Sequence, residues 1–270
     1  MPISLYTFNL FEIGIATITG DPDMGYPEAR LWDRCGAIYW KDTASGSYEF
    51  KVEQVGSDGF GYTDDDFGYT DDSFGYDGDL AEIDLLWVKG HNFIGRTCYW
   101  QYSDTGLSWT TQETWTQADS SPIVKTITPP AEHKFWRLYV ASITNPVCGE
   151  IIMSKGAEFA VMGQPRPRKQ AQANVSWNAS IGGLDRSIKA GPAKNTWEYQ
   201  VRIRSTDTLT FDQASAAFAA EMENLDEYSK PFLIKDIKGN YMLVRLLNEP
   251  PIEHDPPLSE YIDFNIKEVP

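Results

Sequence analysis

The chain has 270 residues, enough for one large or two ordinary domains, and aromatic residues make up 13% of it. Its formal net charge of −16 at pH 7 opposes binding to nucleic acid, whose phosphates recruit Lys and Arg, and to anionic membrane surfaces. No apolar run is long enough to insert across a bilayer. Short aromatic and β-branched runs between Gly, Pro, Asn and Asp predict a mainly β protein.

The N-terminal sequence and the cysteine spacing indicate in which cellular compartment the protein is made. The first residues, MPISLYTFNLFEIG, lack the basic region and cleavage site of a secretory signal peptide, so we expect a product made in the cytoplasm. The three cysteines are widely spaced and form no CxxC pair, which predicts buried thiols instead of a disulfide framework or zinc site: Cys35, Cys98 and Cys148.

The first part of the chain predicts strands at residues 16–19 and 48–53, the second of which alternates apolar and charged residues. Between them, residues 20–27 form a turn-rich loop that carries Met24 and Tyr26. Tyr26 is a candidate ligand-binding residue, and the alternative is that both side chains only pack within the loop.

A seven-residue acidic repeat follows, within a predicted loop at residues 57–79, and its copies begin at Phe60, Phe67 and Phe74. No Lys or Arg lies between Lys51 and Lys89, so the Asp residues repel one another unless they are solvated or neutralised. Because Asp oxygens on a Gly-containing loop suit calcium, four of them form a candidate metal set, although the spacing matches neither an EF-hand nor a nonapeptide β-roll: Asp64, Asp65, Asp71 and Asp72.

Three other interpretations of the repeat stay open. It can be an exposed acidic loop without a ligand. Its flanks can pair as a long hairpin. It can also be a contact loop in which one amphipathic ring per copy anchors a partner: Tyr62, Tyr69 and Tyr76.

The centre of the chain predicts the strongest strands, at residues 83–88, 97–102 and 135–140, around a GHN turn and the segment QYSDTGLSW. With the earlier ARLWD and YW segments and the later CGEII segment, this ordered set resembles the discoidin, or coagulation factor 5/8 type C, group of galactose-binding-like β-sandwiches. The resemblance covers roughly residues 5–160. It implies a jelly-roll β-sandwich that binds ligands through loops at one rim.

The resemblance also implies a structural calcium site. Many sugar-binding relatives hold the ion between an early Asp and a Glu on the last strand, and Asp33 and Glu150 match those positions. Arg34 stands where the family has Gly, which is a departure from the pattern. The alternative is that Asp33 caps a turn while Glu150 is exposed to solvent.

Residues 110–130 predict one strand, at 113–116, and a long loop. Trp115 is a candidate for stacking on a sugar ring, whereas the resemblance makes Trp109 a structural core residue. It likewise gives Arg137 internal polar contacts.

A basic, Pro-containing linker at residues 163–174 separates a first domain at 1–162 from a second at 175–270. The second domain predicts strands at 175–181 and 197–204, a loop at 182–195, and one helix from Thr210 to about residue 225 with Phe218 and Met222 in the core. A hairpin at residues 231–247 and a closing strand at 261–269 complete an α+β domain with one helix on an antiparallel sheet.

The order of this second domain and its PFLIKDIKG hairpin resemble the tail-binding domains of phage distal-tail and baseplate proteins. The implied protein is a virion structural component of a phage or prophage tail tip or baseplate, located in the tail. Its partners would be other tail proteins, itself and host-surface saccharide. The alternative is a stand-alone carbohydrate-binding module without an assembly role.

No enzyme motif is present. The three histidines, His91, His133 and His254, lie in unrelated segments without metal-ligand spacing, and G-x-S-x-G, HExxH and phosphate-loop motifs are absent. The paired carboxylates of the repeat lie in a hydrophilic segment that does not raise a pKa as a glycosidase acid requires. We therefore expect no catalysis, and no cofactor beyond structural Ca²⁺.

Overall fold

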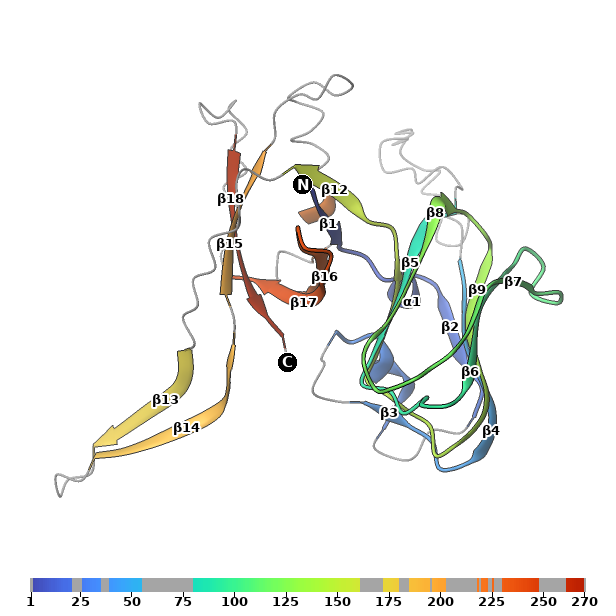
Figure 1. Ribbon diagram of the computed structural model, residues 1–270, viewed down its shortest axis with the longest axis horizontal. Helices are drawn as coiled ribbons and strands as arrows, with labels where there is room; N and C mark the ends of the chain where they lie inside the picture. The colour runs from blue at the N-terminus through green and yellow to red at the C-terminus, as the bar shows by residue number, and fades with distance from the viewer. Residues whose placement is uncertain are drawn as a thin grey trace, which may run out of the picture. The chain divides into compact units, whose positions relative to one another are not determined.

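The structure is a computed structural model that describes residues 2–20, 26–34, 39–54, 80–160, 172–179, 185–194, 196–202, 218, 220–222, 225, 230–247 and 261–269. As the sequence predicts, the described chain is mainly antiparallel β (Figure 1). It divides into two compact units, one of residues Phe8–Lys155 and one that combines Met1–Thr7 with Gly156–Pro270. No helix among the described residues is long and apolar enough to cross a membrane.

The unit of residues 8–155 is a two-layer sandwich. One layer is a five-stranded sheet in the spatial order β2 (Ile15–Ile18), β4 (Ser45–Glu53), β9 (Phe135–Thr144), β6 (Thr97–Ser103) and β7 (Thr110–Thr116). The other layer is a three-stranded sheet in the order β11 (Glu150–Ser154), β5 (Ile83–Lys89) and β8 (Ile123–Ala131).

One hydrophobic core joins the two layers of the sandwich. Phe50, Trp100 and Leu138 from the five-stranded sheet and Leu86 and Ile151 from the three-stranded sheet belong to the same buried cluster. Because side chains alternate across a strand, the strict apolar–polar pattern of β4 and β9 gives each strand one buried face.

Short elements pack against the edge strands of the sandwich: α1 (Leu10–Ile13) contacts β2 and β11, the 3₁₀ helix η1 (Glu28–Leu31) contacts β11 and β3 (Trp40–Lys41), and β3 pairs with β10 (Val147–Cys148). Asn9 ties α1 to β11. Its side-chain amide donates to the carbonyl of Ile151 at 2.8 Å, and its carbonyl oxygen accepts from the backbone N–H groups of Phe11 and Met153 at 3.3 and 3.2 Å. This buried residue thereby caps the helix and fixes it on the sandwich.

The second unit is built on a six-stranded sheet in the order β12 (Ala157–Ala160), β1 (Pro2–Tyr6), β16 (Phe232–Lys235), β17 (Tyr241–Leu246), β18 (Tyr261–Glu268) and β15 (Thr196–Arg202). Phe218 and Met222 are fully buried in its core, as predicted. β13 (Gln172–Ala179) and β14 (Asp185–Lys194) form a separate two-stranded sheet.

The division of the chain differs from the predicted boundary at residue 162. β1 lies between β12 and β16 in the sheet of the second unit, so the N-terminal strand and residues 156–160 belong to that unit and not to the sandwich. The pairing of β1 with strands more than 150 residues away leaves no local mark in its sequence. Of the predicted linker, residues 172–174 begin β13 and the rest lies outside the described residues.

Two predicted loops contain strands. β8 lies within the expected loop at 110–130, and β14 occupies most of the expected loop at 182–195. The hairpin interpretation of the repeat flanks concerns residues outside the described part of the chain; of the strands on either side, β4 pairs with β2 and β9, while β5 pairs with β8 and β11 in the other sheet. The adjacent strands therefore serve different layers.

Candidate functional site

The acidic repeat falls outside the described residues, and with it the candidate residues Asp64, Asp65, Asp71, Asp72, Tyr62, Tyr69 and Tyr76. The residues on either side of it are described. The side-chain oxygen of buried Gln54 accepts from the backbone N–H of Ala81 at 2.7 Å, and its amide donates to the carbonyls of Ala81 and His133 at 3.0 and 3.1 Å. One glutamine thus joins the two ends of the segment.

The two carboxylates of the predicted calcium site interact electrostatically, since the charge of Asp33 contributes to the raised pKa of Glu150. Asp33 is exposed, as a surface turn residue is, but Glu150 is fully buried at the start of β11. The alternative of a solvent-exposed Glu150 is therefore wrong. Strand β11 has all five of its residues buried, since it lies beneath α1 and beside β5.

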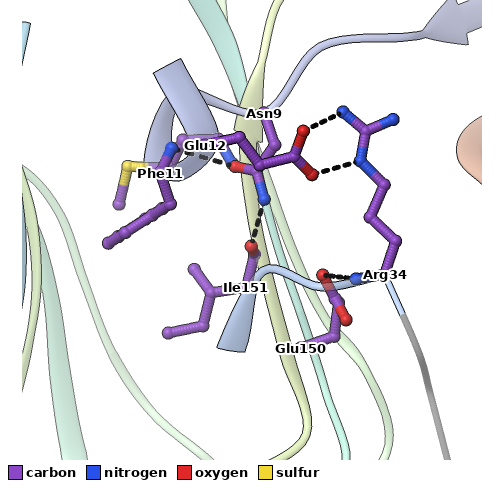
Figure 2. Close-up of polar contacts among 7 residues, drawn as sticks. Asn9, Phe11, Glu12, Arg34, Glu150 and Ile151 are labelled. Atoms are coloured by element: carbon purple, nitrogen blue, oxygen red, sulfur yellow. Dashed lines mark hydrogen bonds and ion pairs between the residues drawn. The ribbon is translucent and has the colours of Figure 1, made fainter. Parts of the chain in front are cut away.

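Arg34 connects Glu150 to a second carboxylate. Its backbone N–H donates to Oε1 of Glu150 at 3.3 Å, and its guanidinium forms a two-point ion pair with Glu12, including Nη2 to Oε2 at 2.9 Å (Figure 2). The φ of Arg34 is 54°, in the left-handed region that glycine favours. The backbone therefore adopts at Arg34 a conformation suited to the glycine that the resemblance expects there.

The environment of Glu150 disfavours its ionised form. Burial is the main cause that raises the pKa of this carboxyl well above its ordinary value, and the charge of Asp33 adds to it. Oε2 of Glu150 has no hydrogen-bond partner among the described residues. A buried carboxylate oxygen without a donor, beside a second carboxylate, fits a hard divalent cation. No group of three or more His, Cys, Asp or Glu suited to a metal occurs in the described part of the chain, so further ligands would be backbone oxygens or water.

A second candidate site surrounds Tyr26. Its ring stacks on that of Tyr39, with centroids 5.1 Å apart and planes inclined by 21°. Tyr39 precedes β3 and keeps 39% of its surface exposed, and Tyr26 precedes η1, which packs beside β3. A hydrogen bond with Tyr26 is the largest cause that raises the pKa of Tyr39, so its phenol stays neutral at physiological pH.

Two cations accompany the stacked rings. The guanidinium carbon of Arg30, in η1, lies 5.4 Å from the centroid of the Tyr26 ring, and the ammonium of Lys41, in β3, lies 5.7 Å from it. We call these four residues the tyrosine cluster: Tyr26, Arg30, Tyr39 and Lys41. The cluster offers aromatic surface, phenol hydroxyls and positive charge.

The sequence predicted only Tyr26 of this cluster. Two others follow once Trp40 is known to be buried, as the structure shows, because the alternation of a strand turns its neighbours Tyr39 and Lys41 outward. Arg30 comes near Tyr26 through the single turn of η1, which the sequence does not indicate.

Trp115 is poorly placed for stacking on a sugar. The ammonium of Lys125 lies 4.7 Å from its ring centroid, its indole N–H donates to Gln117, and its ring packs against the core. Trp109 is half-buried and outside the core cluster, which corrects the core prediction, and the guanidinium of Arg137 lies 3.9 Å from its centroid. Arg137 also donates to Gln101 and Glu49, which confirms its predicted polar contacts.

The buried thiols agree with prediction where the structure describes them. Cys98 and Cys148 are free and buried, and burial raises the pKa of Cys98 to about 12. Cys35 lies outside the described residues. His91 is a structural residue, since its Nδ1 accepts from the N–H of Phe93 and its Nε2 donates to the carbonyl of Ser121.

No family model matches the chain, and no curated protein does. Among solved structures it is similar to a chitosan-binding module from a chitosanase/glucanase of Paenibacillus sp. IK-5, at 16% identity and a TM-score of 0.40 over 54% of this chain and 98% of that one. It is also similar to CBM32-1 from a family 31 glycoside hydrolase of Clostridium perfringens, at 10% identity and a TM-score of 0.36 over 52% and 94%. It is also similar to a GH29 fucosidase of Ruminococcus gnavus, at 14% identity and a TM-score of 0.41 over 57% of this chain and 28% of that one.

Proposed function

We propose that the sandwich unit binds a saccharide at the tyrosine cluster. The observation that carries this proposal is the stacked pair of Tyr26 and half-exposed Tyr39, at 5.1 Å between centroids, beside the contacting short elements η1 and β3. Aromatic faces pack on the apolar face of a pyranose ring, and neutral phenols donate and accept hydrogen bonds with its hydroxyls. The pairing of β3 with β10 holds the backbone that follows Tyr39.

The test replaces one ring of the pair. Tyr39→Ala should lower affinity for the saccharide found on a glycan array about tenfold or more, because aromatic anchors contribute on the order of 2 kcal/mol to binding. The side chain is partly exposed, so the thermal midpoint should stay near that of the parent. A matched control is Tyr99→Ala, which removes a ring from the pair with Tyr139 at 5.6 Å on the sheet. Equal loss in both variants, or no binding to any glycan, would count against the proposal.

From the sequence resemblance, we also propose that the second unit has an assembly role in a phage or prophage tail tip or baseplate, in the virion. The supporting observation is the two-stranded sheet of β13 and β14, which pair only with each other among the described residues. A two-stranded sheet alone is only marginally stable in water, so it favours an additional partner, and we propose a second copy of this chain. The mass of the purified protein in solution tests this idea.

We also propose a structural calcium ion held by the carboxylates of Asp33 and Glu150. The support is the Oε2 of Glu150, which has no hydrogen-bond partner in the described part of the chain, together with the charge of Asp33 that acts on it. The ion would supply positive charge to a buried carboxylate. Calcium binding by the acidic repeat stays a prediction.

The proposed role is non-enzymatic. Catalysis of sugar hydrolysis needs two carboxyl groups placed about 5–10 Å apart on either side of a bound glycosidic bond. Release of reducing sugar from a polysaccharide by the purified protein, lost on changing a single carboxylate, would overturn this assignment.

A further inference from the structure

The tyrosine cluster carries more positive charge than a neutral sugar requires. Arg30 and Lys41 approach the same Tyr26 ring, at 5.4 and 5.7 Å, in a chain whose 39 Asp and Glu outnumber its 23 Lys and Arg. Stacking on a neutral pyranose uses ring faces and hydroxyls only. The position of Arg30 at this half-exposed aromatic pair therefore needs a separate explanation.

Charge pairing within the protein does not supply that explanation for Arg30. Among the described residues, the ion pairs of Arg34, Lys125, Lys134, Arg137 and Lys155 each join a cation to a carboxylate, whereas Arg30 takes part in none. Its guanidinium instead lies against an aromatic ring, a contact that orients it and leaves its N–H donors for other acceptors. A planar fork of N–H donors matches a carboxylate in two-point hydrogen bonding.

A saccharide unit that carries a negative charge would suit both the rings and the cations of the cluster. A uronic or sialic acid combines a pyranose ring, which stacks on an aromatic face, with a carboxylate, which binds a guanidinium or an ammonium. Building on the saccharide-binding function proposed for this cluster, we propose that its ligand is an acidic saccharide, with Tyr39 and Tyr26 contacting the sugar ring and Arg30 and Lys41 binding its carboxylate.

The net charge of the chain sharpens the expected behaviour. At −16 the protein repels an acidic polymer at long range, so its affinity must come from contacts at the cluster itself. The preference for an acidic sugar should therefore depend on these two side chains and not on the overall field of the protein.

The experiment compares acidic saccharides with neutral counterparts. Affinities of the full chain are measured calorimetrically for polygalacturonate against its fully methyl-esterified form, and for sialyllactose against lactose. We expect at least one acidic member to bind about tenfold or more tightly than its neutral counterpart, as a charge-assisted hydrogen bond predicts. Arg30→Gln and Lys41→Gln, singly and together, should reduce that preference, measured as the ratio of the affinities for the acidic and the neutral member.

A matched control is Lys235→Gln. The ammonium of Lys235 lies 5.7 Å from the ring of Tyr241 in the other unit, so this change removes the same charge from a similar contact elsewhere. It should leave the preference intact, and Tyr39→Ala should weaken binding of both members of a pair.

The outcomes separate the two proposals. Equal affinity for acidic and neutral members, or a preference that survives the double substitution, overturns the charge inference while saccharide binding stands. Absence of binding to every acidic and neutral sugar overturns both. If the double variant melts well below the parent, the two single variants decide, since each changes one surface side chain.

Discussion

Glu150 is the residue whose surroundings match its chemistry least. It is fully buried, accepts one hydrogen bond of 3.3 Å from the backbone of Arg34, and has an Oε2 without a partner among the described residues. A buried carboxylate in this condition destabilises the fold unless it is protonated or neutralised by a cation.

This environment predicts that the stability of the fold depends on pH when a chelator keeps the protein free of calcium. The pKa of Glu150 is higher in the folded than in the unfolded chain, so its contribution is fully present below the unfolded pKa and is lost as pH rises through the folded pKa. Over that window the free energy of unfolding should fall by up to about 1.4 kcal/mol per pH unit. Glu150→Gln should remove this slope and raise the thermal midpoint near neutral pH.

Thermal unfolding of parent and variant measures the difference. Glu113→Gln is the control, because its carboxylate forms a surface ion pair with Lys125. His91 changes the stability of the fold in the opposite direction: burial lowers its pKa, so its contribution is present above the unfolded pKa and lost as pH falls through the folded pKa.

Millimolar calcium should raise the thermal midpoint of the parent but not that of Glu150→Gln. An unchanged midpoint of the parent in calcium contradicts the metal proposal.

At the scale of elements, β1 and β9 belong to different hydrophobic cores. Leu5 on β1 and Leu138 on β9 are both fully buried, the first in the core of the second unit and the second in the sandwich. Leu5→Ala and Leu138→Ala should each cost about 2–5 kcal/mol, because each leaves a cavity. Hydrogen exchange should show loss of protection in β16 and β17 for the first and in β4 and β6 for the second. Loss of protection in β9 of Leu5→Ala would contradict two separate cores.

Elements with strong alternation were predictable, and edge elements were not. The central strands were placed correctly: β5 by its nearly continuous apolar run, β6 by its aromatic residues, and β9 by its mostly alternating buried residues. β8 was missed because only Ile123 and Ile127 among its residues are buried and because it carries Pro129 and Pro130. As the edge strand of its sheet it tolerates prolines that a central strand would exclude.

The candidate sites show the same limit at the level of residues. Asp33, Glu150 and Tyr26 came from an ordered resemblance and from loop composition, which indicate position along the chain. The neighbours that give each site its chemistry come from distant segments: Glu12 reaches Arg34 across 22 positions, and Lys41 approaches Tyr26 only because β3 packs beside η1. Such proximity depends on tertiary packing and leaves no periodic pattern.

At the scale of the whole molecule, the proposed assembly role predicts a multimer. Mass photometry of the purified chain should show a dimer or a larger ring in place of a monomer, because β13 and β14 would gain a partner strand from a second copy. Replacement of residues 175–191 by a Gly-Ser linker should return the protein to a monomer. Tyr39→Ala should leave the mass unchanged. A monomeric parent would favour the stand-alone carbohydrate-binding module.

The contact between Gln54 and Ala81 has a consequence for how this chain can evolve. Because the side chain of Gln54 hydrogen-bonds to Ala81 across the intervening segment, we expect the stability of the sandwich to depend little on the number of repeat copies between them. Loop-closure entropy changes by only about 0.6 kcal/mol for a doubling of length. Duplication or loss of whole copies should therefore change the length and charge of this segment at little cost to the stability of the fold.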